Sequence, residues 1–106
     1  MKKRPNIVII NPDQMRADSM FHLGNPAAVT PNLDELAKDG VSFAHAFCQN
    51  PVCTPSRCSF MSGWYPHVAG HRTMNHMMHE YEPVLLKRLK NHGYHVWMNQ
   101  RNDLLP

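Results

Sequence analysis

The sequence predicts an α/β fold in which a parallel sheet is flanked by helices, and two observations carry this prediction. A short unbroken apolar run near the start of the chain is typical of a strand that is buried on both faces. Segments of strand and helix type then follow in the order strand, helix, strand, helix, helix, strand, which favours parallel strands joined by helices. The 106 residues have the length of one ordinary domain.

Three segments are expected to form the strands. Residues 6–11 hold consecutive β-branched apolar residues and end at Asn-Pro, which is a turn signal. Residues 41–47 alternate large and small side chains, as a strand with one buried face does. Residues 94–98 follow a glycine and form the third predicted strand.

The helices are predicted from their end signals. Thr30 is suited to cap a helix that has Pro31 in its first position and ends at Gly40. A short helix is expected to begin at residue 55 or 56 and to stop at Gly63, and another to run from Glu82-Pro83 to a glycine at position 93. Residues 64–79, rich in His, Met and Gly, are expected to form an ordered loop.

The composition excludes several classes of protein. The formal charge of +3 is mild and no basic stripe with interleaved aromatic residues occurs, so a nucleic-acid partner is not expected. A hydrophobic fraction of 42% with 18% charged residues argues against disorder. The longest apolar run is too short to cross a bilayer, and the basic start at residues 1–4 is followed by too few apolar residues for a signal peptide. A cytoplasmic location is therefore the default expectation.

The segment from Pro51 to Gly63 contains the clearest chemistry. Cys53 is expected just before a helix N-terminus, where unpaired backbone N–H groups and the helix dipole favour anions, and Arg57 adds a permanent charge one turn later. Such surroundings favour a thiolate and attract sulfate or phosphate. The three cysteines, Cys48, Cys53 and Cys58, are odd in number and lack zinc-site spacing, so one reactive thiol is the preferred interpretation and a Cys packed in a turn is the alternative.

The pattern Cys53-x-Pro-Ser-Arg57, followed by Ser62-Gly63, resembles the signature of the type I sulfatases. The resemblance implies an alkaline-phosphatase-like fold and the conversion of Cys53 to formylglycine by a maturation enzyme that recognises this pattern. The aldehyde hydrate of residue 53 would then be the nucleophile, and Arg57 would help to hold it. A hydrated aldehyde carries two hydroxyls on one carbon, so one can attack sulfur and the other can expel sulfate by re-forming the carbonyl.

Asp13-Gln14 follows the first predicted strand, where a parallel sheet opens its ligand crevice. Taken alone, Asn-Pro-Asp-Gln is a turn. Within the resemblance, Asp13 and Gln14 match positions that bind a divalent cation together with residue 53, and the Asp-Gln pair resembles choline sulfatases and phosphonate monoester hydrolases. Oxygen ligands suit a hard cation, so Ca²⁺ is expected, with Mg²⁺ or Mn²⁺ as alternatives.

Three further residues are candidates for contact with the substrate. Arg101 stands where the family commonly has a Lys, and its guanidinium would bind the sulfate through two N–H donors. Asp103 stands where the family has a His, and it cannot replace that His as a cation. Arg101 and Asp103 could equally form a surface ion pair. His67 and His71 lie beyond the second predicted helix and could approach the leaving group, or could simply pack in a loop.

Together these features predict that residues 1–106 are the N-terminal portion of a sulfatase catalytic domain that cleaves small sulfate monoesters. The chain is expected to need the remainder of that domain, because sulfatases supply further metal ligands far downstream. Alternatives are a phosphonate or phosphate ester hydrolase of the same superfamily, a His/Cys metal-binding module, and a catalytically inert fragment. No membrane partner is expected.

Overall fold

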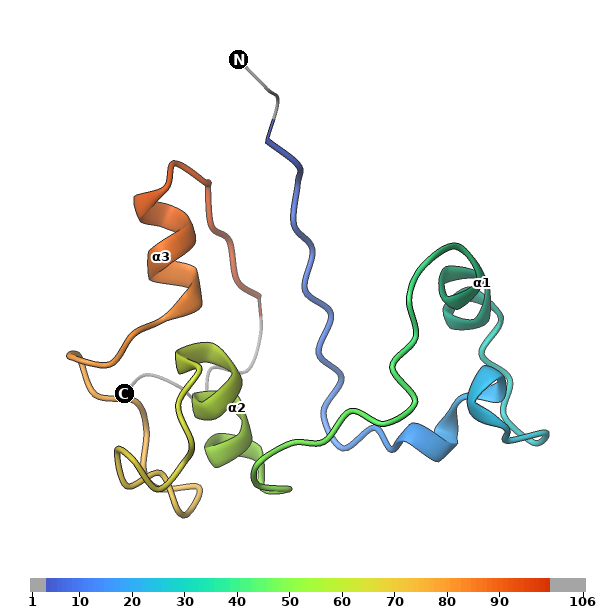
Figure 1. Cartoon of the computed structure of the whole chain (residues 1–106), viewed down its shortest axis with the longest axis horizontal. Helices are drawn as coiled ribbons and strands as arrows, with labels where there is room; N and C mark the ends of the chain where they lie inside the picture. Colours follow the sequence, from blue (N-terminus) through green and yellow to red (C-terminus); the bar gives the residue numbers. More distant parts are fainter. Residues whose placement is uncertain (1–3, 100–106) are drawn as a thin grey trace. The chain divides into compact units, whose positions relative to one another are not determined.

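The computed structural model describes residues 4–99, which form three α-helices and two short 3₁₀ helices (Figure 1). The chain divides into two compact units, Met1–His45 and Ala46–Pro106, which are described separately here. Within residues 4–99, every helix falls short of the length and apolar character that crossing a membrane requires.

The first unit contains η1 (Ala17–Ser19), η2 (Phe21–Leu23) and α1 (Pro31–Asp39). The prediction for α1 is confirmed, with Thr30 as N-cap, Pro31 in the first turn and Gly40 at the end. The Thr30 hydroxyl does not cap the helix backbone, and instead accepts a hydrogen bond from the Phe21 backbone N–H at 3.1 Å. This bond ties the start of α1 to η2.

The second unit contains α2 (Cys53–Ser62) and α3 (Leu85–Asn91). α2 begins earlier than predicted and ends at Gly63, whose φ of 77° places it in the left-handed region that glycine tolerates. α3 begins later than predicted, because Val84 is extended with φ of −126° and ψ of 123°. The end of α3 is a Schellman motif: the Gly93 N–H donates to Lys90 O at 3.0 Å and the Tyr94 N–H to Leu89 O at 3.1 Å.

The predicted sheet is not formed within residues 4–99, which contain no strand. Figure 1 shows residues 4–11 as an extended segment without helix. Its apolar side chains are exposed, from 50% for Ile7 to 82% for Val8, and Phe43 and Phe47 in the second predicted strand are exposed as well. A strand is stabilised only when a partner strand accepts its backbone hydrogen bonds, so the sheet remains a prediction.

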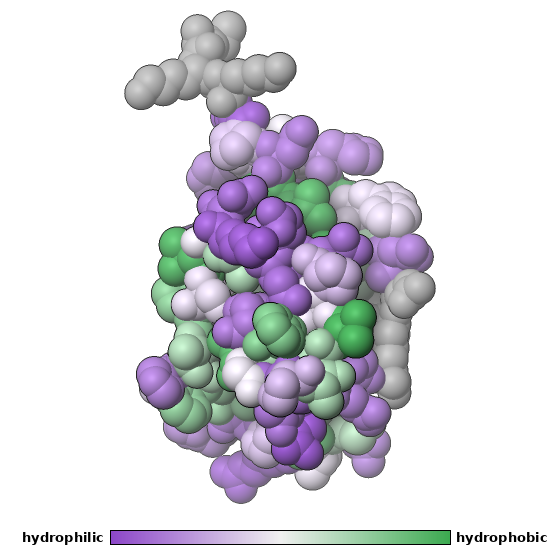
Figure 2. Space-filling view, turned by 90° about the vertical axis from the view of Figure 1, so that its right-hand side faces the viewer, coloured by the Kyte–Doolittle hydropathy of each residue, from purple (hydrophilic) through white to green (hydrophobic). Residues whose placement is uncertain are grey.

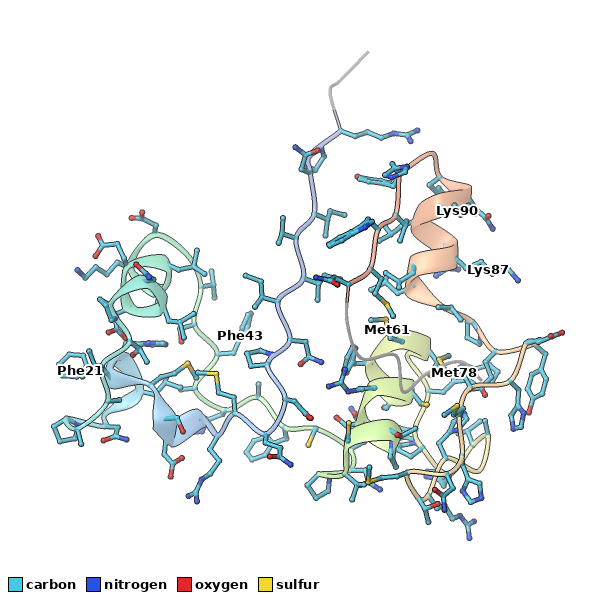
Figure 3. All side chains as sticks on the ribbon, turned by 180° about the vertical axis from the view of Figure 1, so that it is seen from behind. Phe21, Phe43, Met61, Met78, Lys87 and Lys90 are labelled. Atoms are coloured by element: carbon cyan, nitrogen blue, oxygen red, sulfur yellow. The ribbon has the colours of Figure 1, made fainter. Side chains whose placement is uncertain are left out.

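A small hydrophobic core lies in the second unit. Cys58 of α2 and Met78 are buried, and Met61 and Val84 pack against them (Figure 3). Many other apolar side chains stay at the surface, and Figure 2 shows hydrophobic residues exposed among hydrophilic ones. The second unit is therefore the part that builds a core from its own residues.

Candidate active site

The first turn of α2 brings together two of the predicted site residues. Cys53 is the first residue of the helix, and Arg57 follows one turn later. The Arg57 Nε–H donates a hydrogen bond to Cys53 Sγ at a distance of 3.1 Å. Positions i and i+4 of a helix lie on the same side, so helix geometry alone produces this contact. The result is a half-buried sulfur beside a permanent positive charge.

The backbone at this end of α2 begins the hydrogen-bond ladder of the helix. The first intrahelical hydrogen bond is donated by the Ser56 N–H to Val52 O at 3.0 Å. The N–H groups of Cys53 and Thr54 precede this bond, and Pro55 has no N–H to satisfy. The helix N-terminus therefore adds partial positive charge next to Cys53.

One face of α2 is anchored in the second unit. The buried residues of the helix are Thr54, Pro55, Cys58 and Ser59, which recur with helical spacing. The Ser59 hydroxyl donates to Gln49 Oε1 at 3.0 Å and so fastens the helix to the segment that precedes it. Burial, and to a lesser extent the negative charge of Glu82, raises the pKa of the Cys58 thiol to about 11. Cys58 is thus a neutral packing residue.

A buried pair of hydrogen-bonded side chains, His71 and Glu82, lies in the same unit. His71 Nε2 is 2.7 Å and 2.8 Å from the two carboxylate oxygens of Glu82, and both side chains are almost fully buried. His71 Nδ1 is 2.7 Å from the carbonyl oxygen of His76, and the His79 N–H donates to Glu82 Oε1 at 2.7 Å. No spacing rule revealed this pair, because its members are eleven residues apart in a loop.

The predicted substrate residues are placed differently. His67 is exposed and stacks on Tyr65 with ring centroids 5.7 Å apart, so it is accessible to a ligand. Both ring nitrogens of His71 are engaged in the buried pair, which favours a structural role for His71 over contact with a substrate. Arg101 and Asp103 lie outside the described residues.

Asp13 and Gln14 lie in a turn of the first unit. Gln14 has a φ of 56°, which is uncommon for a residue with a side chain and occurs more often at functional sites than elsewhere. A carboxylate and an amide side chain offer the oxygen donors that a hard divalent cation prefers. Within residues 4–99, no three His, Cys, Asp or Glu side chains gather closely enough to bind a metal.

Sequence reasoning missed a second polar cluster in the first unit. The Asp34 carboxylate accepts hydrogen bonds from the His22 N–H and the Thr30 hydroxyl, each at 3.1 Å, and lies 3.0 Å from His22 Nδ1. His22 Nε2 is in turn 3.2 Å from the Ser42 hydroxyl. Asp34 lies in the first turn of α1, but its partners could not be predicted from spacing.

An open depression lies beside α2 in the second unit. Its lining residues include Phe47, Phe60, Trp64 and Tyr65, whereas Cys53 and Arg57 do not line it. The depression is therefore separate from the Cys53–Arg57 contact.

Comparison with known proteins identifies the family of this chain. The sequence pattern of the family described as Sulfatase matches residues 5–104. An ulvan-active sulfatase of Formosa agariphila is 38% identical over 93 residues, which are 88% of this chain and 18% of that protein. An arylsulfatase of Clostridium perfringens is 36% identical over 94 residues, covering 88% of this chain and 20% of its own length.

The human steryl-sulfatase is 41% identical over 63 residues, which are 59% of this chain and 11% of that protein. The chain thus spans about a fifth or less of the length of these curated relatives. Among solved structures, none matches the chain significantly. Because the family pattern covers nearly all of the sequence, including the Cys53 motif and Asp13-Gln14, this chain belongs to the Sulfatase family.

Proposed function

We propose that this chain is the nucleophile-bearing part of a sulfatase, an enzyme that hydrolyses sulfate monoesters. The observation that carries this proposal is the Cys53-x-Pro-Ser-Arg57 motif at the start of α2, with Arg57 Nε 3.1 Å from Cys53 Sγ, inside a sequence that matches the Sulfatase family. The names of the relatives favour a sulfate ester over the phosphonate or phosphate ester alternative and over a His/Cys metal-binding module.

Cys53 is proposed to become formylglycine through a maturation enzyme that recognises this motif. When present, the formylglycine hydrate supplies one hydroxyl to attack sulfur and a second to release sulfate as the carbonyl re-forms. Arg57 keeps its charge beside residue 53 throughout, because a guanidinium does not deprotonate in proteins. The Arg57 side chain and the N-terminus of α2 thereby orient the sulfate and offset its charge.

Asp13 and Gln14 are proposed to hold a divalent cation, together with residue 53. The donor set fits, because a carboxylate oxygen and an amide oxygen on adjacent residues suit Ca²⁺, which we expect, or Mg²⁺ or Mn²⁺. The left-handed backbone of Gln14 supports this assignment, because uncommon backbone conformations of this kind cluster at functional sites. The cation would polarise sulfate oxygens and favour ionisation of the nucleophile.

Arg101 is proposed to bind the sulfate and His67 to approach the leaving group, with the remainder of a larger catalytic domain completing the site. The exposed ring of His67 supports its part in this assignment. The relatives act on substrates as different as ulvan and steryl sulfates according to their names, so the alcohol part of the ester is not assigned. The cytoplasmic location stays a prediction.

Mass spectrometry of the peptide that contains residue 53 tests the proposal. The enzyme that includes this segment is produced in a host with the maturation enzyme, and we expect the mass loss of a thiol-to-aldehyde conversion at residue 53, with Cys48 and Cys58 unchanged as internal controls. Release of sulfate from an aryl sulfate should exceed release of phosphonate from the matching aryl phosphonate. An active preparation with an intact Cys53 thiol would contradict the mechanism.

A further inference from the structure

The buried His71–Glu82 pair has an unusual hydrogen-bond requirement. His71 is 2% exposed and Glu82 is 3% exposed, so neither can exchange its partners for water. Two acceptor groups face the His71 ring. The carbonyl oxygen of His76 is 2.7 Å from Nδ1, and Oε1 of the Glu82 carboxyl group is 2.7 Å from Nε2. A carbonyl oxygen and an ionised carboxylate accept hydrogen bonds and donate none.

A neutral imidazole carries a proton on one ring nitrogen only, so it cannot donate to both of these acceptors. The geometry therefore calls for one proton between His71 Nε2 and the Glu82 carboxyl group, in addition to the proton on Nδ1. Losing this proton would leave a lone pair of His71 facing a buried carboxylate, an arrangement with a high cost in free energy. The pair is thus a neutral unit that holds its proton inside the protein.

This pair closes a loop that packs on the helix carrying Cys53. Between His71 and Glu82 lies Met78, which packs on Cys58 of α2, and Val84 packs there two residues after Glu82. The Glu82 charge also acts on the Cys58 thiol. The hydrogen bond from the His79 N–H holds the loop around the carboxylate at 2.7 Å.

We propose that His71 and Glu82 are positioning residues for the nucleophile, acting through the buried face of α2. This inference rests on the proposed function of Cys53. The loop packs on the face of α2 that contains Cys58, and Cys53 and Arg57 are half-buried residues of the same helix. The contact at Cys58 therefore fixes how α2 is seated in the second unit, and with it the exposure of Cys53 beside Arg57.

Labelling of the three thiols with iodoacetamide tests this role in the unmodified 106-residue chain. Peptide-resolved mass spectrometry gives a rate for each cysteine over a range of pH, and the exposed Cys48 is the reference. Glu82→Gln is compared with Glu80→Gln, which removes an exposed charge two residues away. In Glu82→Gln we expect Cys58 labelling to rise about tenfold or more and the pH profile of Cys53 to move toward that of Cys48.

The outcomes separate positioning from local packing. A rise at Cys58 with an unchanged Cys53 profile, or equal profiles for Glu82→Gln and Glu80→Gln, would overturn the proposal. Should Glu82→Gln lose its helical circular dichroism, Glu82→Asp replaces it, and we expect intermediate rates because the charge is kept.

The test is independent of the chemistry proposed for the enzyme. It uses the thiol form of residue 53 and no sulfate ester, so failure to find formylglycine would leave the positioning result intact. Conversely, pH profiles of cysteine labelling that do not change in Glu82→Gln would refute the positioning role of His71 and Glu82. The sulfatase proposal would be unaffected.

Discussion

The two units of this chain are stabilised in different ways. In the second unit, buried residues on α2 and the following loop form a core, which includes Cys58, Met78 and the His71–Glu82 pair. In the first unit, no described residue from 4 to 45 is buried, and hydrogen bonds around Asp34 join α1 to η2. The unit that contains Cys53 therefore builds local order from its own residues, whereas the first unit leaves apolar segments exposed.

The largest expected effect follows from the chemistry of the second unit. In the enzyme that contains this segment, Cys53→Ala should lower kcat/KM for an aryl sulfate by at least about 10³-fold, because the precursor of the nucleophile is lost. Leu36→Ala, on an exposed position of α1, should change kcat/KM by less than about twofold. A Cys53→Ala enzyme that kept most of its sulfate release would refute the assignment of residue 53.

The next effect concerns the stability of the two units. Met78→Ala should lower the free energy of unfolding by about 2 kcal/mol, because it truncates a buried side chain that packs on Cys58. Leu36→Ala should lower it by less than about 0.5 kcal/mol. Urea unfolding followed by circular dichroism measures both. Equal losses of unfolding free energy in the two variants would mean that the difference in packing between the units does not produce a difference in stability.

A third prediction uses alkaline pH to act on the second unit. Burial raises the pKa of Cys58 from its ordinary value of 9.0 to about 11 in the folded chain, so the folded state holds the thiol proton more tightly than the unfolded state. This contribution to stability is fully present below pH 9.0 and is lost as the pH rises toward 11. The free energy of unfolding, measured by urea unfolding at several pH values, should therefore fall between pH 9.0 and about 11. In Cys58→Ala this fall should be absent.

The smallest effect is expected at acid pH in the first unit. Desolvation acts to raise the pKa of Asp34, but hydrogen bonds from His22 and Thr30 outweigh it and hold the pKa below the ordinary 3.8. The ionised carboxylate therefore stabilises the link between α1 and η2 above pH 3.8, and the contribution is lost as the pH falls through the lowered pKa. Amide exchange of the His22 N–H should accelerate in that range, and Asp34→Asn should remove the dependence.

Local signals predicted the helices well. Thr30, Pro31 and Gly40 located α1, and the glycine at position 63 located the end of α2. The start of α3 was misplaced because Glu82, which reads as an early acidic residue of a helix, forms a pair with His71 eleven residues back. Pairings across a loop leave no periodic trace in the sequence.

The candidate site was predicted to the extent that it depends on helix spacing. Cys53 and Arg57 meet because four residues make one helical turn, so their contact follows from the motif. The burial of His71 could not be predicted, since a histidine in a Met-rich loop gives no indication of which side it faces. The predicted sheet stays unconfirmed, because none of the three segments forms a strand within residues 4–99.

The exposed segment from Ile7 to Ile10 has a practical consequence for the isolated chain. Its side chains are 50% to 82% exposed, and an exposed apolar segment with free backbone groups is a template for pairing with a second copy. The 106-residue chain should therefore self-associate in solution as its concentration rises. A lysine at position 8 or 10 should act as a gatekeeper against this association and improve solubility without touching the core around Cys58.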